Sequence, residues 1–382
     1  MGDSLPLVSL GTGRSAVALA LGRDHTCALL DNGLLKCWGR NDHGQLGLGD
    51  TTHRGGSPGD MGDHLPFLNL TNAGTRAVAV AAGYYHTCAV MDVSGGQLKC
   101  WGYNANRQLG QGTTTDVFGK VAGHMGDALP YVLLGAGRHV VAAAAGLSHT
   151  CASLDNGRVR CFGNNQYGQL GAGDATQGPT SLAQMGDNLP YANLGSDVGT
   201  GEAHHNLVVA LAAGTEHTCA LMDTGSLKCW GRNHVGQLGV GNKQDYGRGT
   251  YYTGDRIPYV QLGSNGTAVA VTAGAYHSCA LLEDTRAKCW GFNSNGQLGL
   301  GDTNHRGDNG NEMGDFLPSS ITLNAEEAPS GEIMWRCRRA LPSIYTPTYP
   351  CSYTSPLTLL PDCSSRHVAV CTRLPMFTNV SM

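Results

Sequence analysis

Charged residues are scarce in this chain: Asp, Glu, Lys and Arg together make up 14% of its 382 residues. The 25 basic and 29 acidic side chains give a net charge of −4, and no basic block occurs along the chain. The chain therefore lacks the clustered positive charge that a phosphate-binding surface needs, which argues against nucleic acid as a partner. So few charges also argue against long amphipathic helices.

Long apolar runs are absent as well. The longest candidates, residues 140–145 and 207–213, are short and rich in alanine. A membrane-spanning helix needs about 20 apolar residues, so these runs predict buried strands and no membrane span. The segment Met1–Pro6 has neither the cationic start nor the apolar core of a signal peptide.

Glycine, in contrast, is abundant, with 56 residues, roughly twice the average share of about 7%. The glycines belong to a repeat that occurs five times. Its first block is His-Thr/Ser-Cys-Ala, at residues 25–28, 86–89, 149–152, 217–220 and 277–280. Its second block is Lys/Arg-Cys-Trp/Phe-Gly, at residues 36–39, 99–102, 160–163, 228–231 and 288–291.

Two further blocks complete each repeat. An Asn, two variable residues and Gly-Gln-Leu-Gly follow the second block, as in residues 41–47. The linker Met-Gly-Asp-x-Leu-Pro begins at Met1, Met61, Met125, Met185 and Met313, with a degenerate copy at residues 254–258. Six linkers thus bracket five complete repeats, over about residues 1–323.

Each repeat predicts four short strands, which in the first repeat are residues 17–21, 25–30, 34–39 and the Leu-Pro-x-x-x-Leu piece of the linker. Asp31-Asn32-Gly33 is a tight hairpin signal. Four antiparallel strands at a fixed period, with glycine-rich turns, are typical of a propeller blade. We therefore predict an all-β propeller of four-stranded blades.

The two recurring motifs also identify a family resemblance. The pattern Ala-Gly-x-x-His-Ser/Thr-x-Ala-Leu followed by Trp-Gly-x-Asn-x-x-Gly-Gln-Leu-Gly resembles the regulator of chromosome condensation family of propellers. That resemblance implies seven blades around a central channel, whereas five complete repeats are present. We therefore expect a fragment of a seven-bladed ring, with Met1 an internal methionine of a longer protein.

The resemblance ends near residue 323. From Asn324 onward the repeat disappears and Pro, Ser and Thr become frequent. We predict that residues 324–382 are a linker, a disordered tail or a wrongly predicted end. Cys337, Cys351, Cys363 and Cys371 fall in this segment, and no spacing identifies partners for them.

The repeats contain ten of the 14 cysteines, two in each. Cys27 and Cys37 are symmetric about Asn32, so they lie opposite one another across the predicted hairpin. In the second repeat the turn is two residues longer, and the spacing of the cysteines lengthens to match. Opposed residues of an antiparallel pair come close enough for a disulfide. We predict the bridges Cys27–Cys37, Cys88–Cys100, Cys151–Cys161, Cys219–Cys229 and Cys279–Cys289.

Two alternatives to the bridges remain open. The cysteines could serve as small buried hydrophobic residues. A metal site built from His25, Cys27 and Cys37 would lack a fourth ligand and a familiar zinc spacing, so we predict neither a metal nor a cofactor. Disulfides persist mainly in oxidising compartments, so the bridges favour an extracellular or secretory location, with the cytoplasm as the alternative.

The other repeated residues are predicted to be structural. The resemblance implies that the motif histidines bond a loop backbone within their own blade. The motif aromatics are expected to pack between blades, and Gly44, Gly168, Gly236 and Gly296 to hold turns with positive φ. Arg107 occupies this glycine position in the second repeat, which leaves its turn geometry open. The histidines are His25, His86, His149, His217 and His277; the aromatics are Trp38, Trp101, Phe162, Trp230 and Trp290.

No catalytic constellation is recognised, and no phosphate-binding Gly-x-x-x-x-Gly-Lys-Ser/Thr occurs. We predict a non-enzymatic propeller that binds a protein or glycan partner through the variable loops that follow Gly-Gln-Leu-Gly on one face. The resemblance implies a guanine-nucleotide exchange factor or scaffold for a small GTPase as the alternative. Asn69, Asn265 and Asn379 begin sequons that permit glycosylation in a secretory setting but do not by themselves indicate it.

Overall fold

A computed structural model describes residues 5–71, 74–115, 118–174, 177–198, 206–264, 266–319 and 321–322. The chain divides into one unit of residues 3–325 and a second of residues 1–2 and 326–382. All described residues belong to the first unit. The predicted tail, with Cys337, Cys351, Cys363 and Cys371, lies outside them.

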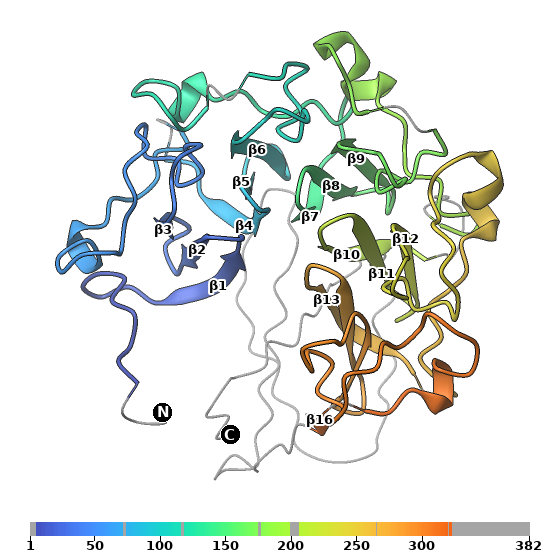
Figure 1. Cartoon of the computed structure of the whole chain (residues 1–382). Helices are drawn as coiled ribbons and strands as arrows, with labels where there is room; N and C mark the ends of the chain where they lie inside the picture. The colour runs from blue at the N-terminus through green and yellow to red at the C-terminus, as the bar shows by residue number, and fades with distance from the viewer. Residues whose placement is uncertain are drawn as a thin grey trace, which may run out of the picture. The chain divides into compact units, whose positions relative to one another are not determined.

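Five antiparallel β-sheets follow one another around a centre in the first unit (Figure 1). Each sheet is one blade, in which the chain runs from the innermost strand outward. The innermost strands are β1 (Ala16–Leu21), β4 (Ala77–Ala82), β7 (Val140–Ala145), β10 (Val208–Ala213) and β13 (Ala268–Ala273). The middle strands are β2 (His25–Leu30), β5 (His86–Met91), β8 (His149–Leu154), β11 (His217–Met222) and β14 (His277–Leu282). The third strands are β3 (Leu35–Gly39), β6 (Gln97–Gly102), β9 (Val159–Gly163), β12 (Leu227–Gly231) and β15 (Arg286–Gly291).

The outermost element differs from the prediction. Among the described residues, only the fifth blade has a fourth strand, β16 (Ile321–Thr322), and the other four sheets are three-stranded. In the first blade the Leu-Pro-x-x-x-Leu segment makes one hydrogen bond to β3, from Leu68 N to Leu35 O at 2.9 Å. Proline has no N–H to donate, and Leu68 is buried between the segment and its blade. The segment is therefore held mainly by packing.

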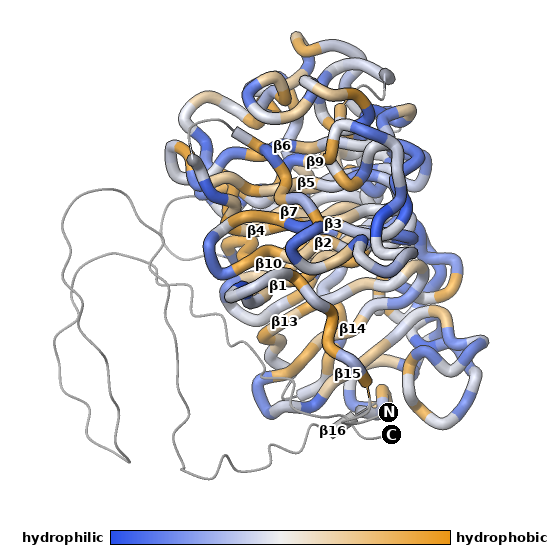
Figure 2. The backbone as a smooth tube through the Cα atoms, turned by 90° about the vertical axis from the view of Figure 1, so that its left-hand side faces the viewer, coloured by the Kyte–Doolittle hydropathy of each residue, from blue (hydrophilic) through white to orange (hydrophobic). Residues whose placement is uncertain are grey.

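The hydrophobic core lies between successive blades. One cluster joins Cys27, Leu29 and Leu35 of the first blade to Ala89 and Trp101 of the second, and three similar clusters follow around the arc. The innermost strands contain a single polar residue, Thr272, and no charged one. Figure 2 shows this hydrophobic character along β4, β7 and β10. Each blade thus depends on its neighbours to bury its apolar faces.

Within the described part of the chain, the first and last blades each have a neighbouring blade on one side only. Leu19 and Leu21 of β1 are 60% and 71% exposed. At the other end, His277, Cys279 and Leu281 of β14 are half-buried, whereas β5, β8 and β11 are buried throughout. The five blades form an open arc, in agreement with the prediction of a partial ring.

Short 3-10 turns at the linkers are the helical elements of the described residues: Gly62–His64, Gly126–Ala128, Leu182–Gln184, Gly186–Asn188, Thr250–Tyr252, Gly254–Arg256 and Gly314–Phe316. Over the same described ranges, no helix has the length and apolar character needed to cross a membrane.

Candidate functional site

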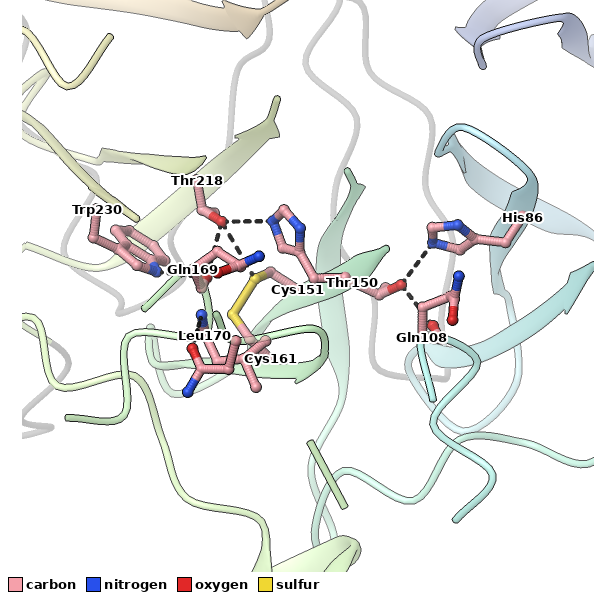
Figure 3. Close-up of a disulfide and its surroundings, with 11 residues drawn as sticks. His86, Gln108, Thr150, Cys151, Cys161, Gln169, Leu170, Thr218 and Trp230 are labelled. Atoms are coloured by element: carbon pink, nitrogen blue, oxygen red, sulfur yellow. Dashed lines mark hydrogen bonds between the residues drawn. A yellow bond between two sulfur atoms is a disulfide. The ribbon is translucent and has the colours of Figure 1, made fainter. Parts of the chain in front are cut away.

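A chain of hydrogen bonds joins each blade to the next. His86 Nε2 lies 2.9 Å from Thr150 Oγ1 of the following blade, and that hydroxyl donates to Gln108 O at 2.8 Å (Figure 3). The same pattern links His25 to Thr87, His149 to Thr218 and His217 to Ser278. The expectation that these histidines bond a backbone group within their own blade is wrong, because their partner is a side-chain hydroxyl of the next blade.

The chain of hydrogen bonds assigns the histidine tautomer. A backbone carbonyl can only accept, so the Thr150 hydroxyl donates to Gln108 and must accept from His86 Nε2–H. The proton therefore sits on Nε2, and Nδ1 is buried without a partner. Burial lowers the pKa of His86 to about 3 and that of His149 to about 4. These histidines are neutral structural groups at physiological pH.

The same carbonyl receives the motif tryptophan. Trp101 Nε1 donates to Gln45 O at 3.0 Å, and Trp230 Nε1 donates to Gln169 O at 2.9 Å. Phe162 fills this position in the third blade and has no N–H. The repeated Gln-Leu pair thus presents a backbone acceptor to the following blade. Trp101, Trp230 and Trp290 pack between blades as predicted, whereas Trp38 of the first blade is half-buried.

Each predicted cysteine pair lies directly opposite in the ladder between the middle and third strands. In the first blade the Sγ atoms of Cys27 and Cys37 are 2.03 Å apart and their Cα atoms 4.1 Å apart, and the other four pairs have matching geometry. Cys151 also lies beside the hydrogen-bond chain, with its Sγ 3.8 Å from Thr218 Oγ1. The paired sulfurs are therefore part of the contact between blades.

A buried cation between the two cysteine-bearing strands and the linker is a feature that the sequence analysis missed. Lys99 Nζ donates to Leu70 O at 2.7 Å and to Gly126 O at 2.8 Å, and lies 4.6 Å from the centre of the Tyr131 ring. Lys36, Lys228, Lys288 and Arg160 make equivalent contacts with linker carbonyls. The available signal was the basic residue that precedes the second cysteine of each repeat.

The loops after Gly-Gln-Leu-Gly return to the end of the third strand. Arg54 bridges Gly39 in the first blade, and Arg306 bridges Gly291 in the fifth. The loops of the second, fourth and fifth blades also pack on the glycine turn of the preceding blade, as Gly119 does on Gly44. Arg107 has φ +65, so this arginine adopts the left-handed conformation that glycine has at the other turns.

The two residues between Gly and His in each repeat lie at that same end of the blades. They form the turn from the innermost to the middle strand, and their side chains differ in every repeat: Arg-Asp, Tyr-Tyr, Leu-Ser, Thr-Glu and Ala-Tyr. Together with the residues just after each third strand they form what we call the interaction face. Its aromatic and charged members are Arg23, Asp24, Arg40, Tyr84, Tyr85, Tyr103, Glu216, Arg232, Tyr276 and Phe292, and Tyr167 joins them through its contact with Arg232.

The first cluster on the interaction face spans the first two blades. Arg23 donates to the Tyr85 hydroxyl at 2.5 Å and lies over the rings of both Tyr84 and Tyr85. Arg40 approaches the same Tyr85 ring at 5.6 Å. The Tyr84 hydroxyl lies 2.9 Å from Thr215 Oγ1, two blades further along. Arginines that are about half exposed are thus held in place by tyrosines.

A second cluster spans the third to fifth blades. Arg232 pairs with Glu216 at 2.6 Å and lies 4.4 Å from the centre of the Tyr167 ring. Tyr276 makes an edge-on contact with Phe292, with ring centres 6.5 Å apart. The prediction placed binding on the loops after Gly-Gln-Leu-Gly, and it did not single out these turns. The available signal was the pair of variable positions inside an otherwise constant Gly-x-x-His motif.

One Gly-x-Ser-x-Gly spacing does occur, at residues 55–59. In a hydrolase this motif places a serine on a strand–turn–helix elbow. Here Ser57 lies in an exposed loop, and its backbone N–H donates to Asp60 Oδ2 at 2.9 Å. The segment is a surface turn and not a strand–turn–helix elbow.

Comparison with protein families matches residues 3–316 to the RCC1-like domain. The ultraviolet-B receptor UVR8 of Arabidopsis thaliana is 32% identical over 288 residues, which are 75% of this chain and 55% of that protein. The human E3 ubiquitin-protein ligase HERC2 is 28% identical over 288 residues, 75% of this chain and 5% of that protein. The chain therefore spans about half the length of the first relative and a small part of the second.

Solved structures agree on the fold. Yeast RCC1 (Prp20), in its crystal structure with Kap60, superposes with a TM-score of 0.56 and 21% identity, covering 81% of this chain and 61% of that chain. Human WBSCR16 superposes with a TM-score of 0.55 and 19% identity, covering 77% of this chain and 66% of that chain.

Proposed function

This chain belongs to the RCC1-like domain family, and on that premise we propose that it is a non-enzymatic module that binds a protein partner through the interaction face. The observation that carries the proposal is the contrast between repeated and variable positions. The repeated side chains described above hold the blades and linkers together. The variable residues of the Gly-x-x-His turns instead bring tyrosine and arginine to the surface of that scaffold.

Tyrosine and arginine are the residue types that dominate binding energy at protein interfaces. Their preorganisation supports this role, because a side chain already held in place loses less conformational entropy on binding. Tyr85 is fixed by Arg23, and Tyr84 is fixed by Thr215. Acidic neighbours such as Asp24 and Asp42 limit the net charge of the first cluster. We therefore expect a partner surface of mixed polarity rather than a polyanion.

We place this binding in an oxidising compartment, outside the cell or in a secretory lumen. The support is the five cysteine pairs at bonding distance, since such bonds are reduced in the cytosol.

The test compares two arginines at opposite ends of the first blade. Arg23→Ala combined with Tyr103→Ala removes part of the interaction face, whereas Arg14→Ala removes an exposed arginine that pairs with Asp31 at the hairpin end. We expect a partner captured from extracellular extract by the wild-type chain to be retained by Arg14→Ala. The double variant should bind the purified partner at least about tenfold more weakly, the loss of one contact of 1.4 kcal/mol. Equal capture by all three proteins would refute the role of this face.

The same proteins test the alternatives. If the partner is a glycan, the wild-type chain should bind a glycan array. The double variant should not bind it, because sugar rings would stack on the same tyrosines. Acceleration of nucleotide release from a panel of small GTPases would favour the exchange factor that the resemblance implies. If nucleotide release is not accelerated and the double variant no longer binds the captured partner, the interaction module remains as the function.

A further inference from the structure

Four of the six linkers have a glycine after their last leucine, and the second linker does not. Gly11, Gly135, Gly195 and Gly263 follow the last leucine of their linkers and all have positive φ, from +97 to +120. The second linker has Thr71 at this place. The exchange completes the sequon Asn69-Leu70-Thr71, whereas the third-blade counterpart Asn193-Leu194-Gly195 is not a sequon.

The structure directs Asn69 outward. Leu68 and Leu70 on either side are 4% and 6% exposed, and the Asn69 side chain between them is exposed. The backbone is fixed at this point, because Gly126 N donates to Asn69 O at 2.9 Å and Lys99 Nζ donates to Leu70 O at 2.7 Å. The segment therefore holds Asn69 between two buried leucines, with its exposed side chain beside Gly126 of the next linker.

This position is remote from the interaction face along the blade. The outer segment runs antiparallel to β3, and Leu68 N already pairs with Leu35, the first residue of that strand. Asn69 follows Leu68 and lies at the end of the blade that carries the hairpin turn before Leu35. The interaction face lies at the other end, where β3 finishes at Gly39. A bulky group on Asn69 would leave the interaction face open.

We propose that Asn69 carries an N-linked oligosaccharide. The inference rests on the oxidising compartment of the proposed function, since N-glycosylation of sequons occurs in secreted proteins. The donor is an oligosaccharide linked to a lipid diphosphate. A bond forms between Asn69 Nδ2 and the anomeric carbon C1, while the C1–O bond to the diphosphate breaks. The lipid diphosphate leaves with that electron pair, and one amide proton passes to a base of the transferase.

The experiment expresses the full chain in the secretory pathway of a eukaryotic host and maps its peptides after treatment with peptide N-glycosidase. The enzyme converts a glycosylated asparagine to aspartate, so modification at Asn69 is read directly and separately from Asn265 and Asn379, which lie outside the described residues. We expect conversion at residue 69 and a shift in gel mobility. Asn69→Gln and Thr71→Gly should abolish the conversion.

Thr71→Gly is the matched control, because it restores the residue that four other linkers use and keeps Asn69 itself. Thr71→Ser preserves the sequon and should remain modified. An unmodified Asn69 in a secreted chain whose cysteines are bridged overturns this inference alone. Free cysteines throughout would overturn the proposed compartment together with it. Loss of partner binding in Arg23→Ala/Tyr103→Ala reports on the proposed function independently of the glycan.

Discussion

His149 in the third blade donates from Nε2 to Thr218 Oγ1 in the fourth, 2.9 Å away, and that hydroxyl donates in turn to the carbonyl of Gln169 at 3.1 Å. The two residues are 69 positions apart in the chain, yet the same pair recurs at every junction between described blades. Because all three groups are buried, the pair links the stability of one blade to that of the next.

Removing the Thr218 hydroxyl should therefore weaken the junction. Thr218→Val leaves the His149 N–H buried without a partner, which costs about 1–3 kcal/mol, while the Gln169 carbonyl keeps its bond from Trp230. Urea denaturation should show a lower midpoint. Thr218→Ser is the control, since Ser278 occupies the same place at the next junction. Equal stability of the valine and serine variants would contradict this account.

Acidification should destabilise the propeller between about pH 6.5 and pH 4. The folded chain holds the pKa of His149 near 4 and that of His86 near 3, whereas an unfolded histidine titrates near pH 6.5. As the pH falls through this range the unfolded chain gains protons that the folded chain does not, so the free energy of unfolding decreases. At pH 5 each buried histidine should lower the free energy of unfolding by on the order of 2 kcal/mol relative to neutral pH.

Denaturant unfolding measured from pH 8 to pH 4 checks this prediction. Histidines with smaller shifts should matter less: His277 is half-buried, and burial lowers its pKa without a neighbouring blade to cover it. His277→Asn should therefore change the slope with pH less than His149→Asn does. A free energy of unfolding that stays constant from pH 7 to pH 5 would contradict the neutral, buried state of these histidines.

The five cysteine pairs should differ in their resistance to reductant. Cys279 is half-buried and Cys289 is 8% exposed, while Cys219 and Cys229 are both fully buried. Thiol–disulfide exchange requires access to a sulfur. In a titration with reductant followed by thiol labelling and peptide mass spectrometry, Cys279–Cys289 should be reduced first. Prior reduction of Cys219–Cys229, or free thiols in all repeats before reductant is added, would be inconsistent with the structure.

The glycine turns allow a test of contact between blades. Gly236 and Gly296 have nearly the same φ, +79 and +76, but a Cβ on Gly236 would lie 2.3 Å from Asp308 N, whereas a Cβ on Gly296 would meet nothing within 4 Å. Gly296→Ala should cost about 1–2 kcal/mol for the left-handed backbone alone. Gly236→Ala should cost more, because backbone must also move. Thermal unfolding of both variants measures the difference, and equal losses would contradict the contact.

The spacing of the cysteines was sufficient to predict which ones face each other. A hairpin is a local structure, and the distance of Cys27 and Cys37 from Asn32 fixes which residues are opposed. The repeat also predicted the blades and the open arc. The fourth strand was overestimated, because pattern alone does not reveal that the linker is held by packing and by the buried Lys36 instead of a ladder of backbone bonds.

The partner of each motif histidine could not be derived from the sequence. His149 and Thr218 belong to different repeats, and each stands in the His-Thr-Cys motif of its own repeat. The tyrosine–arginine clusters were missed for the same reason. Arg23 and Tyr85 are 62 residues apart. The residue types at their positions differ from repeat to repeat, so periodicity gives no signal for their contact.

The sequence by itself determined the repeat, the strand pairing within each blade and the facing of the cysteines, because those features depend on contacts a few residues apart. The tertiary structure alone decided which blade faces which. It brought His149 to Thr218, Lys99 to the linker carbonyls, and the variable Gly-x-x-His turns into one face, because burial of apolar blade surfaces stacks neighbouring repeats and places distant residues together.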